Sequence, residues 1–187
     1  MLQYLKDYGK YVEITGYKGI AFDNAEIFLK ANRKQTRQNM DIQFFDAELI
    51  ATQEHLYFAV LNALQAFKDK TNISKSLAME TILYASAQRQ IKKAINRAGI
   101  KPQTQNMALV IVGDDPKQIE TTNEAVTKSL GSEPDERVLD LTKNKEAKIK
   151  AAFEITDEEI KVLENGNQKK ALTNLVIERV ALLSTQQ

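Results

Sequence analysis

The spacing of apolar and polar residues along the chain predicts alternating strands and helices. Between residues 47 and 68 apolar side chains recur at three- and four-residue steps, which predicts a helix with one buried face. Residues 107–112 form an uninterrupted, partly β-branched apolar run. Such a run is typical of a central strand buried on both faces.

Shorter patterns predict the elements of the N-terminal quarter. Residues 11–15 are expected to form a strand closed by Gly16 and Gly19, and residues 41–45 a second strand. Between them, residues 24–33 have helical spacing, with an apolar face expected from Ile27, Phe28 and Ala31.

A basic helix is predicted in the middle of the chain. Thr71 and Asn72 interrupt the preceding helix, and Ser74 or Ser76 can cap the next one because a short hydroxyl accepts the free amide hydrogens of a helix start. This helix is expected to continue to about Ala98, where Gly99 stops it.

The C-terminal part is predicted to be mainly helical. Asp115 followed by proline begins a helix at 116–130, Thr156 and Glu159 form a capping box, and a turn at 165–167 precedes a last apolar helix at 169–183. Residues 137–141 are a weak strand candidate, and the charge-rich residues 143–150 have no clear pattern. The fold class expected is α+β, with a small mixed or mainly antiparallel sheet of three to four strands and helices on its faces.

Composition narrows the class of protein. A chain of 187 residues with 43% hydrophobic content is long enough for one core, so we expect a single domain over residues 1–187. The net charge is +1, so any nucleic-acid surface must be local. Cysteine is absent, no apolar run spans a bilayer, and the N-terminus lacks the apolar core of a signal peptide, so we expect a cytoplasmic protein.

The sequence offers little catalytic chemistry. His55 is the only histidine and lies within a predicted helix, so a structural role is favoured over a triad. Asp114 and Asp115 resemble a carboxylate pair for a metal, but a helix cap is the stronger interpretation. No phosphate-binding glycine loop is present. We therefore expect no metal, no cofactor and no enzymatic activity.

The segment from Thr71 to Lys101 carries six basic residues against the single acid Glu80, a net charge of +5. On a continuous helix, three of the basic residues fall on one face: Arg89, Lys93 and Arg97. The opposite, buried side would be supplied by Leu83, Ala87, Ile91, Ala94, Ile95 and Ala98. Such a ridge can hold RNA phosphates while Tyr84 stacks a base; the alternative is a solvated basic face with Tyr84 in the core.

Five pieces of sequence, in order, resemble one family: residues 45–51, 54–56, 72–77, 83–86 and 89–91. The chain is similar to the archaeal kinase-binding, tRNA-recruiting subunit of the KEOPS complex, and residues 177–183 resemble that family's last helix. Residues 114–153 match poorly and read as a family-variable insertion. Thr52 and Ala87 stand where members often have glycine, and the second change is expected to stiffen the helix beside Gln88.

The resemblance implies a non-catalytic adaptor in the pathway that places a threonylcarbamoyl group on the adenosine beside the anticodon. It would bind the single-stranded CCA end of tRNA and dock on a small kinase-like ATPase subunit. The alternative is a module that binds and regulates a kinase without touching RNA.

The resemblance also implies where each partner lies. Polar groups beside an apolar shelf, at a helix start whose amides favour phosphate, suit unpaired RNA. The RNA site implied comprises Asn72, Ile73, Ser74, Lys75, Ser76, Tyr84, Gln88, Arg89, Gln90, Lys93 and Arg97. The alternative is that Asn72 and the serines only cap the helix. The last helix is apolar on more than one side, which suits either its own core or the kinase-like partner, through Leu172, Leu175, Val176, Ile177, Val180 and Leu183.

Overall fold

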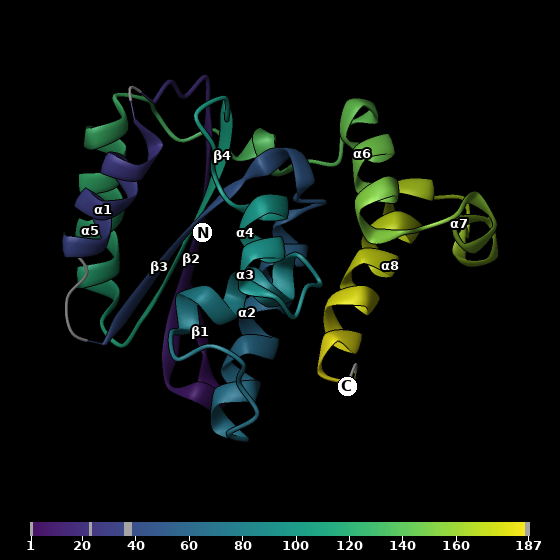
Figure 1. Cartoon of the computed structure of the whole chain (residues 1–187), viewed down its shortest axis with the longest axis horizontal. Helices are drawn as coiled ribbons and strands as arrows, with labels where there is room; N and C mark the ends of the chain where they lie inside the picture. The colour runs from purple at the N-terminus through teal and green to yellow at the C-terminus, as the bar shows by residue number, and fades with distance from the viewer. Residues whose placement is uncertain (1, 23, 36–38, 186–187) are drawn as a thin grey trace. The chain divides into compact units, whose positions relative to one another are not determined.

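The computed structural model describes residues 2–22, 24–35 and 39–185, drawn in Figure 1. The chain divides into two compact units, each built from two separate stretches. We call them the sheet unit, Met1–Ala47 with Ile100–Val138, and the helical unit, Glu48–Gly99 with Leu139–Gln187. The α+β class is confirmed. That the whole chain behaves as one domain, and that residues 114–153 are an insertion, stay predictions.

A four-stranded antiparallel sheet, in the order β1-β2-β4-β3, forms the sheet unit. Its strands are β1 (Leu2–Leu5), β2 (Lys10–Lys18), β3 (Met40–Asp46) and β4 (Asn106–Gly113). The apolar run at 107–112 lies in β4, between β2 and β3, so the prediction of a central strand is confirmed.

Two details of the sheet were predicted incorrectly. Gly16 does not end the strand predicted at residues 11–15, because it pairs with Ala108 inside the sheet. That strand, β2, continues to Lys18 and ends before Gly19, whose φ is 68°. The edge strand β1 was not predicted because it is short and three of its four side chains are exposed, which removes the hydrophobic signal.

Two helices, α1 (Ala25–Gln35) and α5 (Pro116–Leu130), lie side by side against one face of the sheet (Figure 1). Phe28 of α1 meets Phe44 of β3 edge to face, with ring centroids 5.1 Å apart. Ile27, predicted on the apolar face, is 66% exposed, because Leu29 packs against the core in its place. The start of α5 is as predicted, with the Asp115 carboxylate accepting a hydrogen bond from the Lys117 amide at 3.0 Å.

The helical unit contains six α-helices among its described residues, three in each of its two stretches. They are α2 (Gln53–Lys68), α3 (Leu77–Ala85), α4 (Ile91–Ala98), α6 (Lys143–Phe153), α7 (Asp157–Leu163) and α8 (Gln168–Leu182). The core shared by the two stretches consists of Ala51, Leu141, Ile149, Phe153, Ile155, Ile160, Ala171, Leu172, Leu175 and Val176.

Helix starts in the helical unit follow their caps. Helix α2 begins at Gln53, later than predicted, because the Thr52 hydroxyl caps it and residues 47–49 form a 3-10 turn. The capping box of Thr156 and Glu159 is confirmed at α7. Residues 137–141 are not a strand; Glu136–Leu139 is a 3-10 turn. The charge-rich stretch without a clear pattern forms α6.

Three helices of this unit end at a left-handed residue that is not glycine. Lys70 follows the C-cap of α2 and has a φ of 58°, and Ala87 follows the C-cap of α3 and has a φ of 48°. Glu154 is itself the C-cap of α6, with a φ of 54°. In each case the following amide bonds a carbonyl five residues earlier, the arrangement that ordinarily has glycine at the left-handed position. The predicted single helix up to Ala98 is therefore two helices, with a break at residues 86–90.

Within the described ranges, no helix combines the length and the apolar character needed to cross a bilayer.

Candidate nucleic-acid interface

Residues 71–76 form a loop that leads into α3, which we call the 71–76 loop. Ser76 caps α3, because its hydroxyl accepts a hydrogen bond from the Met79 amide at 3.4 Å. The Ser74 hydroxyl accepts from the Ser76 amide at 3.3 Å, and the Asn72 side-chain amide donates to the Ser74 carbonyl at 2.9 Å. The predicted capping role is thus present, and Ser74 is buried by these contacts.

A buried carboxylate holds the other end of this loop. Glu80, on α3, is 0% exposed, and its two oxygens accept hydrogen bonds from the Ile73 amide at 3.1 Å and the Ser74 amide at 2.7 Å. Glu80 therefore occupies two loop amides, those of Ile73 and Ser74, that a phosphate would otherwise meet. What the loop offers to a ligand are side chains, chiefly the exposed Ile73 and Lys75.

The break between α3 and α4 is fixed by side-chain donors from α2 and α4. The Ala85 carbonyl bonds His55 Nε2 at 2.8 Å, and the Ser86 carbonyl accepts from the Arg97 guanidinium at 3.1 Å. Ala87 takes the left-handed conformation, and the amides of Ala87 and Gln88 close the end of α3. The chain therefore turns before α4 begins, and the helix that Ala87 was expected to stiffen ends there.

The basic ridge is shorter than predicted. Lys93 and Arg97 lie four residues apart on α4, but Arg89 precedes this helix and donates to the Leu183 carbonyl at 3.3 Å. Among the described residues, neither arginine is in a salt bridge, and Lys93 is exposed. Burial lowers the pKa of Arg97, while the Glu154 carboxylate raises it. The positive charges predicted for RNA are therefore not consumed by internal ion pairs.

A pocket of about 310 Å³ adjoins the break. Gln88 and Arg97 line it on one side, with Glu154 and Arg179 also in its wall, and Phe153 supplies an apolar surface. Arg179 forms a salt bridge with Glu159. Among the described residues that line the pocket, Arg97 is therefore the basic side chain whose hydrogen bond goes to a backbone carbonyl. This volume is at the lower end of the roughly 300–1,000 Å³ typical of small-ligand sites.

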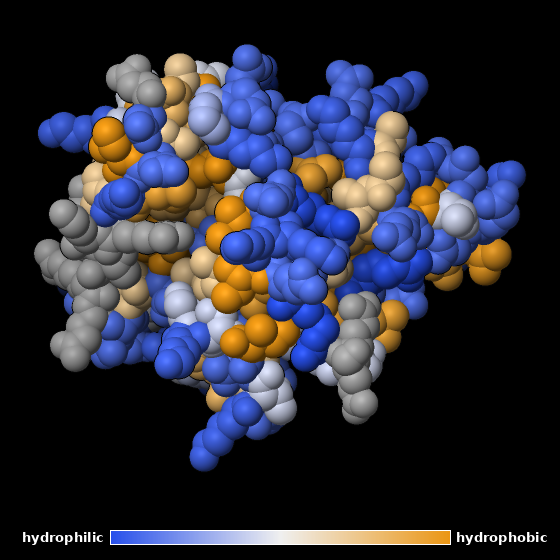
Figure 2. All heavy atoms as spheres, in the orientation of Figure 1, coloured by the Kyte–Doolittle hydropathy of each residue, from blue (hydrophilic) through white to orange (hydrophobic). Residues whose placement is uncertain are grey.

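Three apolar residues have exposures opposite to those predicted. Tyr84 is 5% exposed, which leaves too little ring for a base to stack on, and burial raises the pKa of its hydroxyl. Ile91 and Ile95, expected in the core, are each 41% exposed because Ala94 and Ala98 alone turn α4 toward its neighbours. Figure 2 shows hydrophobic and hydrophilic surface next to each other in the region of α4.

Comparison with known proteins identifies the family. A model described as Kinase binding protein CGI-121 matches residues 19–184. The chain belongs to the CGI-121 family.

Two curated relatives agree with this membership. The chain is 32% identical to the Regulatory protein Cgi121 of Methanocaldococcus jannaschii over 142 residues, which is 76% of this chain and 83% of that protein. It is 26% identical to the EKC/KEOPS complex subunit CGI121 of Coccidioides immitis over 103 residues, 55% of this chain and 48% of that protein. The resemblance seen in the sequence is confirmed, and a family of kinase-binding proteins agrees with the predicted non-catalytic role. That this CGI-121 protein binds RNA, and through which side chains, stays a prediction.

The partner surface predicted on the last helix needs correction. The side chains of Leu172, Leu175, Val176, Val180 and Leu183 are all buried, at 0–3% exposure. They belong to the interior of the helical unit, where α8 packs on α2, α6 and α7. Of the predicted set Ile177 is half-buried, and Leu182, the last residue of the same helix, is 40% exposed.

His55 is structural in this CGI-121 protein. Its ring is 0% exposed, and Nδ1 accepts a hydrogen bond from the Ala51 amide at 3.2 Å. Because Nδ1 is an acceptor, the ring proton lies on Nε2, which donates to the Ala85 carbonyl. Burial lowers the pKa of His55 to about 4, so the ring is neutral and fully bonded at neutral pH.

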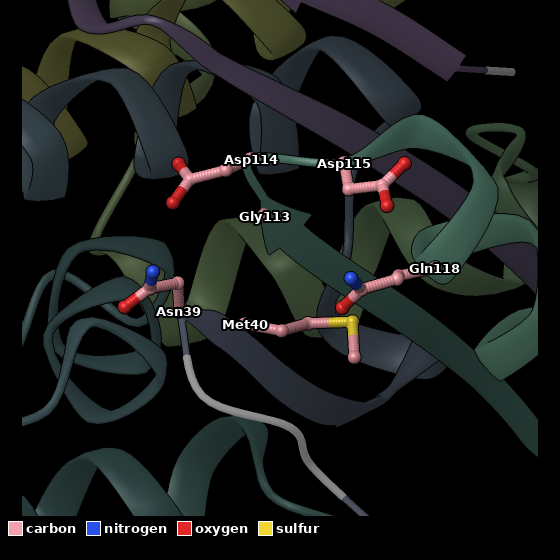
Figure 3. A pocket seen from close by; sticks show the side chains of 6 residues that line it. All are labelled: Asn39, Met40, Gly113, Asp114, Asp115 and Gln118. Carbon is pink, nitrogen blue, oxygen red and sulfur yellow. The ribbon is translucent and has the colours of Figure 1, made fainter.

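Asp114 and Asp115 are also structural. Their carboxylates point in different directions beside a cavity of about 80 Å³ (Figure 3). Asp114 pairs with Lys10 at 2.5 Å, and Asp115 caps α5. Across the described part of the chain, no three histidine or acidic side chains are grouped as metal ligands would be.

Glu80 is the site residue that the sequence analysis missed, having been counted only as an acid within a basic segment. The sequence spacing places Leu77, Glu80, Thr81 and Tyr84 on one helical face, and the structure shows that all four are buried. A buried carboxylate requires hydrogen-bond donors, and for Glu80 these are the backbone amides of the 71–76 loop.

Proposed function

We propose that this chain is a non-catalytic, kinase-binding regulatory subunit of a KEOPS-type complex that binds the single-stranded CCA end of tRNA. Membership in the CGI-121 family supports the kinase-binding and KEOPS parts of the proposal. The RNA part is supported chiefly by one observation. Lys75 and Lys93 are exposed, and Arg89 and Arg97 bond backbone carbonyls, so these four cations are available to phosphates.

Charge and shape in this region suit an unpaired strand. Single-stranded RNA places flexible phosphates and open base faces together, and proteins bind it with cations beside apolar or aromatic shelves. Ile73 provides an exposed apolar surface on the 71–76 loop, and Gln88 and Gln90 add amide groups at the break before α4. Neutralising about four phosphates of a single strand gives a log–log salt slope near −3.

The division of labour within such a complex follows from what this chain offers. Its only histidine is neutral and buried, and its paired aspartates are a cap and an ion pair, so chemistry on the tRNA would belong to other subunits. The chain would recruit the tRNA whose adenosine beside the anticodon receives the threonylcarbamoyl group. On α8, the kinase-like subunit would meet Ile177 and Leu182, since the other predicted contacts are internal.

Binding measurements test both parts of the proposal. The purified chain is titrated into fluorescent tRNA with an intact CCA end and into the same tRNA lacking those three nucleotides, alone and with the kinase-like subunit. We expect the intact tRNA to bind more tightly by at least tenfold, and the kinase-like subunit to co-purify with the chain. Equal affinity for the two RNAs would leave the alternative, a kinase-binding module that does not contact RNA.

A further inference from the structure

Glu80 is the one carboxylate in the described part of the chain that is fully buried and aimed at a surface loop. It is 0% exposed, and both oxygens are used by backbone amides of the 71–76 loop, at 3.1 Å for Ile73 and 2.7 Å for Ser74. A buried carboxylate is tolerated only when such donors satisfy it. The contacts join α3 to a loop whose residues lie in neither a helix nor a strand.

We propose that Glu80 is a positioning residue that fixes the 71–76 loop so that Ile73 faces the unpaired bases of the RNA. This inference rests on the RNA-binding function proposed above. Ile73 is 39% exposed, so its own burial does not determine its direction, whereas the next residue, Ser74, is 8% exposed. The bond from Glu80 to the Ile73 amide sets the backbone from which that side chain projects.

The same contacts determine the kind of ligand group that the loop recognises. Glu80 occupies the Ile73 and Ser74 amides, and serine hydroxyls occupy those of Ser76 and Met79. A phosphate therefore finds none of these four amides free. The loop contacts the RNA through the Ile73 side chain against a base face, and the phosphates lie on the cations instead.

Charge and positioning predict opposite effects when Glu80 is neutralised. If its charge alone mattered, Glu80→Gln would tighten RNA binding, because a negative group near phosphates would be removed. If Glu80 positions the loop, the variant binds more weakly, because the glutamine NH₂ group faces one of the two backbone amides and leaves it without an acceptor. The sign of the change therefore separates the two roles.

The experiment compares Glu80→Gln with Thr81→Val in the full chain. Thr81 is the matched control because it is 1% exposed on the same helix, and its hydroxyl bonds the Leu77 carbonyl at 2.8 Å, within α3 and away from the loop. Amide hydrogen exchange of Ile73 and Ser74 is measured without RNA, and the affinity for intact tRNA is measured over a series of salt concentrations.

For Glu80→Gln we expect exchange at Ile73 and Ser74 to accelerate at least tenfold and tRNA affinity to fall roughly tenfold, with the salt slope unchanged because no phosphate contact is lost. Thr81→Val should leave all three quantities as in the wild type. Ile73→Ala should lose similar affinity while the two amides stay protected, and this variant decides the question if Glu80→Gln does not fold.

Unchanged or tighter binding by Glu80→Gln overturns the inference, as does wild-type affinity in Ile73→Ala. Free-peptide exchange rates at both amides in the wild type also overturn it. Failure of the RNA function itself looks different: no CCA-dependent binding is seen in the wild type, while the exchange rates still report whether Glu80 holds the loop.

Discussion

Acidification should destabilise this protein through His55 before its surface carboxylates are protonated. In the folded state Nδ1 accepts from the Ala51 amide and Nε2 donates to the Ala85 carbonyl. A second proton must go to Nδ1, where it removes an acceptor and places a charge in a site with no solvent exposure. The nearby charge of Lys145 opposes it further.

The size and direction of the effect follow from the two pKa values. The folded-state pKa of His55 is about 4, against an ordinary value of 6.5 for an exposed histidine. Between these values the unfolded chain binds the proton and the folded chain does not, so lowering the pH favours unfolding. The stability is fully present above pH 6.5 and is lost as the pH falls from 6.5 to about 4. The loss over this window is about 3 kcal/mol.

Urea unfolding at a series of pH values from 4 to 8 measures this loss. The control variant is His55→Gln, which keeps a hydrogen-bonding side chain but does not titrate. Asp135, Asp157 and Glu159, whose pKa values are lowered by hydrogen bonds and ion pairs, contribute equally to both proteins. We expect the wild-type free energy of unfolding to fall by about 3 kcal/mol more than that of the variant. Parallel pH profiles would refute the reasoning.

Two further predictions concern the break before α4 and the cations around it. Ala87→Gly should raise the free energy of unfolding by about 0.5–1 kcal/mol, because glycine adopts a φ of 48° without the steric cost that alanine has there. Thermal or urea unfolding measures this change, and a variant less stable than the wild type would contradict the left-handed conformation assigned to residue 87. Arg89→Glu with Lys93→Glu should weaken tRNA binding by at least tenfold and make the salt slope shallower, with little change in melting temperature, because Lys93 is exposed and Arg89 bonds only one carbonyl. Loss of folding in the double variant would show that these side chains are structural.

Helix starts were predictable because their signals are local. Asp115 before a proline, and Thr156 three residues before Glu159, specify caps whose chemistry needs no tertiary partner, and both are present. The end of α3 was not predictable in this way, because Ala87 occupies a left-handed position that ordinarily signals itself by glycine. Side-chain donors from His55 and Arg97, 30 and 11 residues away from the carbonyls they bond, determine that end instead.

The same distinction explains the errors at the candidate site. A helix that is apolar on several sides, such as α8, can be interior or interface, and only the packing of α2, α6 and α7 shows that Leu172 and Leu175 are interior. Ile91 was predicted in the core but is exposed, because α4 is a separate helix that begins after the break; Tyr84, on α3, is buried. The positions of the basic residues and of the loop before α3 could be predicted from sequence spacing. The neighbours of these residues depend on tertiary contacts, which the spacing does not show.

The division of each unit between two stretches affects how the protein is made. On the ribosome, the strands and helices of the sheet unit have all been synthesised by Val138, while the interior of the helical unit still lacks α6, α7 and α8. The Arg89 guanidinium finds its carbonyl only at Leu183, which is synthesised after α6, α7 and α8. A nascent chain therefore carries the basic segment early but completes its support only after α8 has been synthesised.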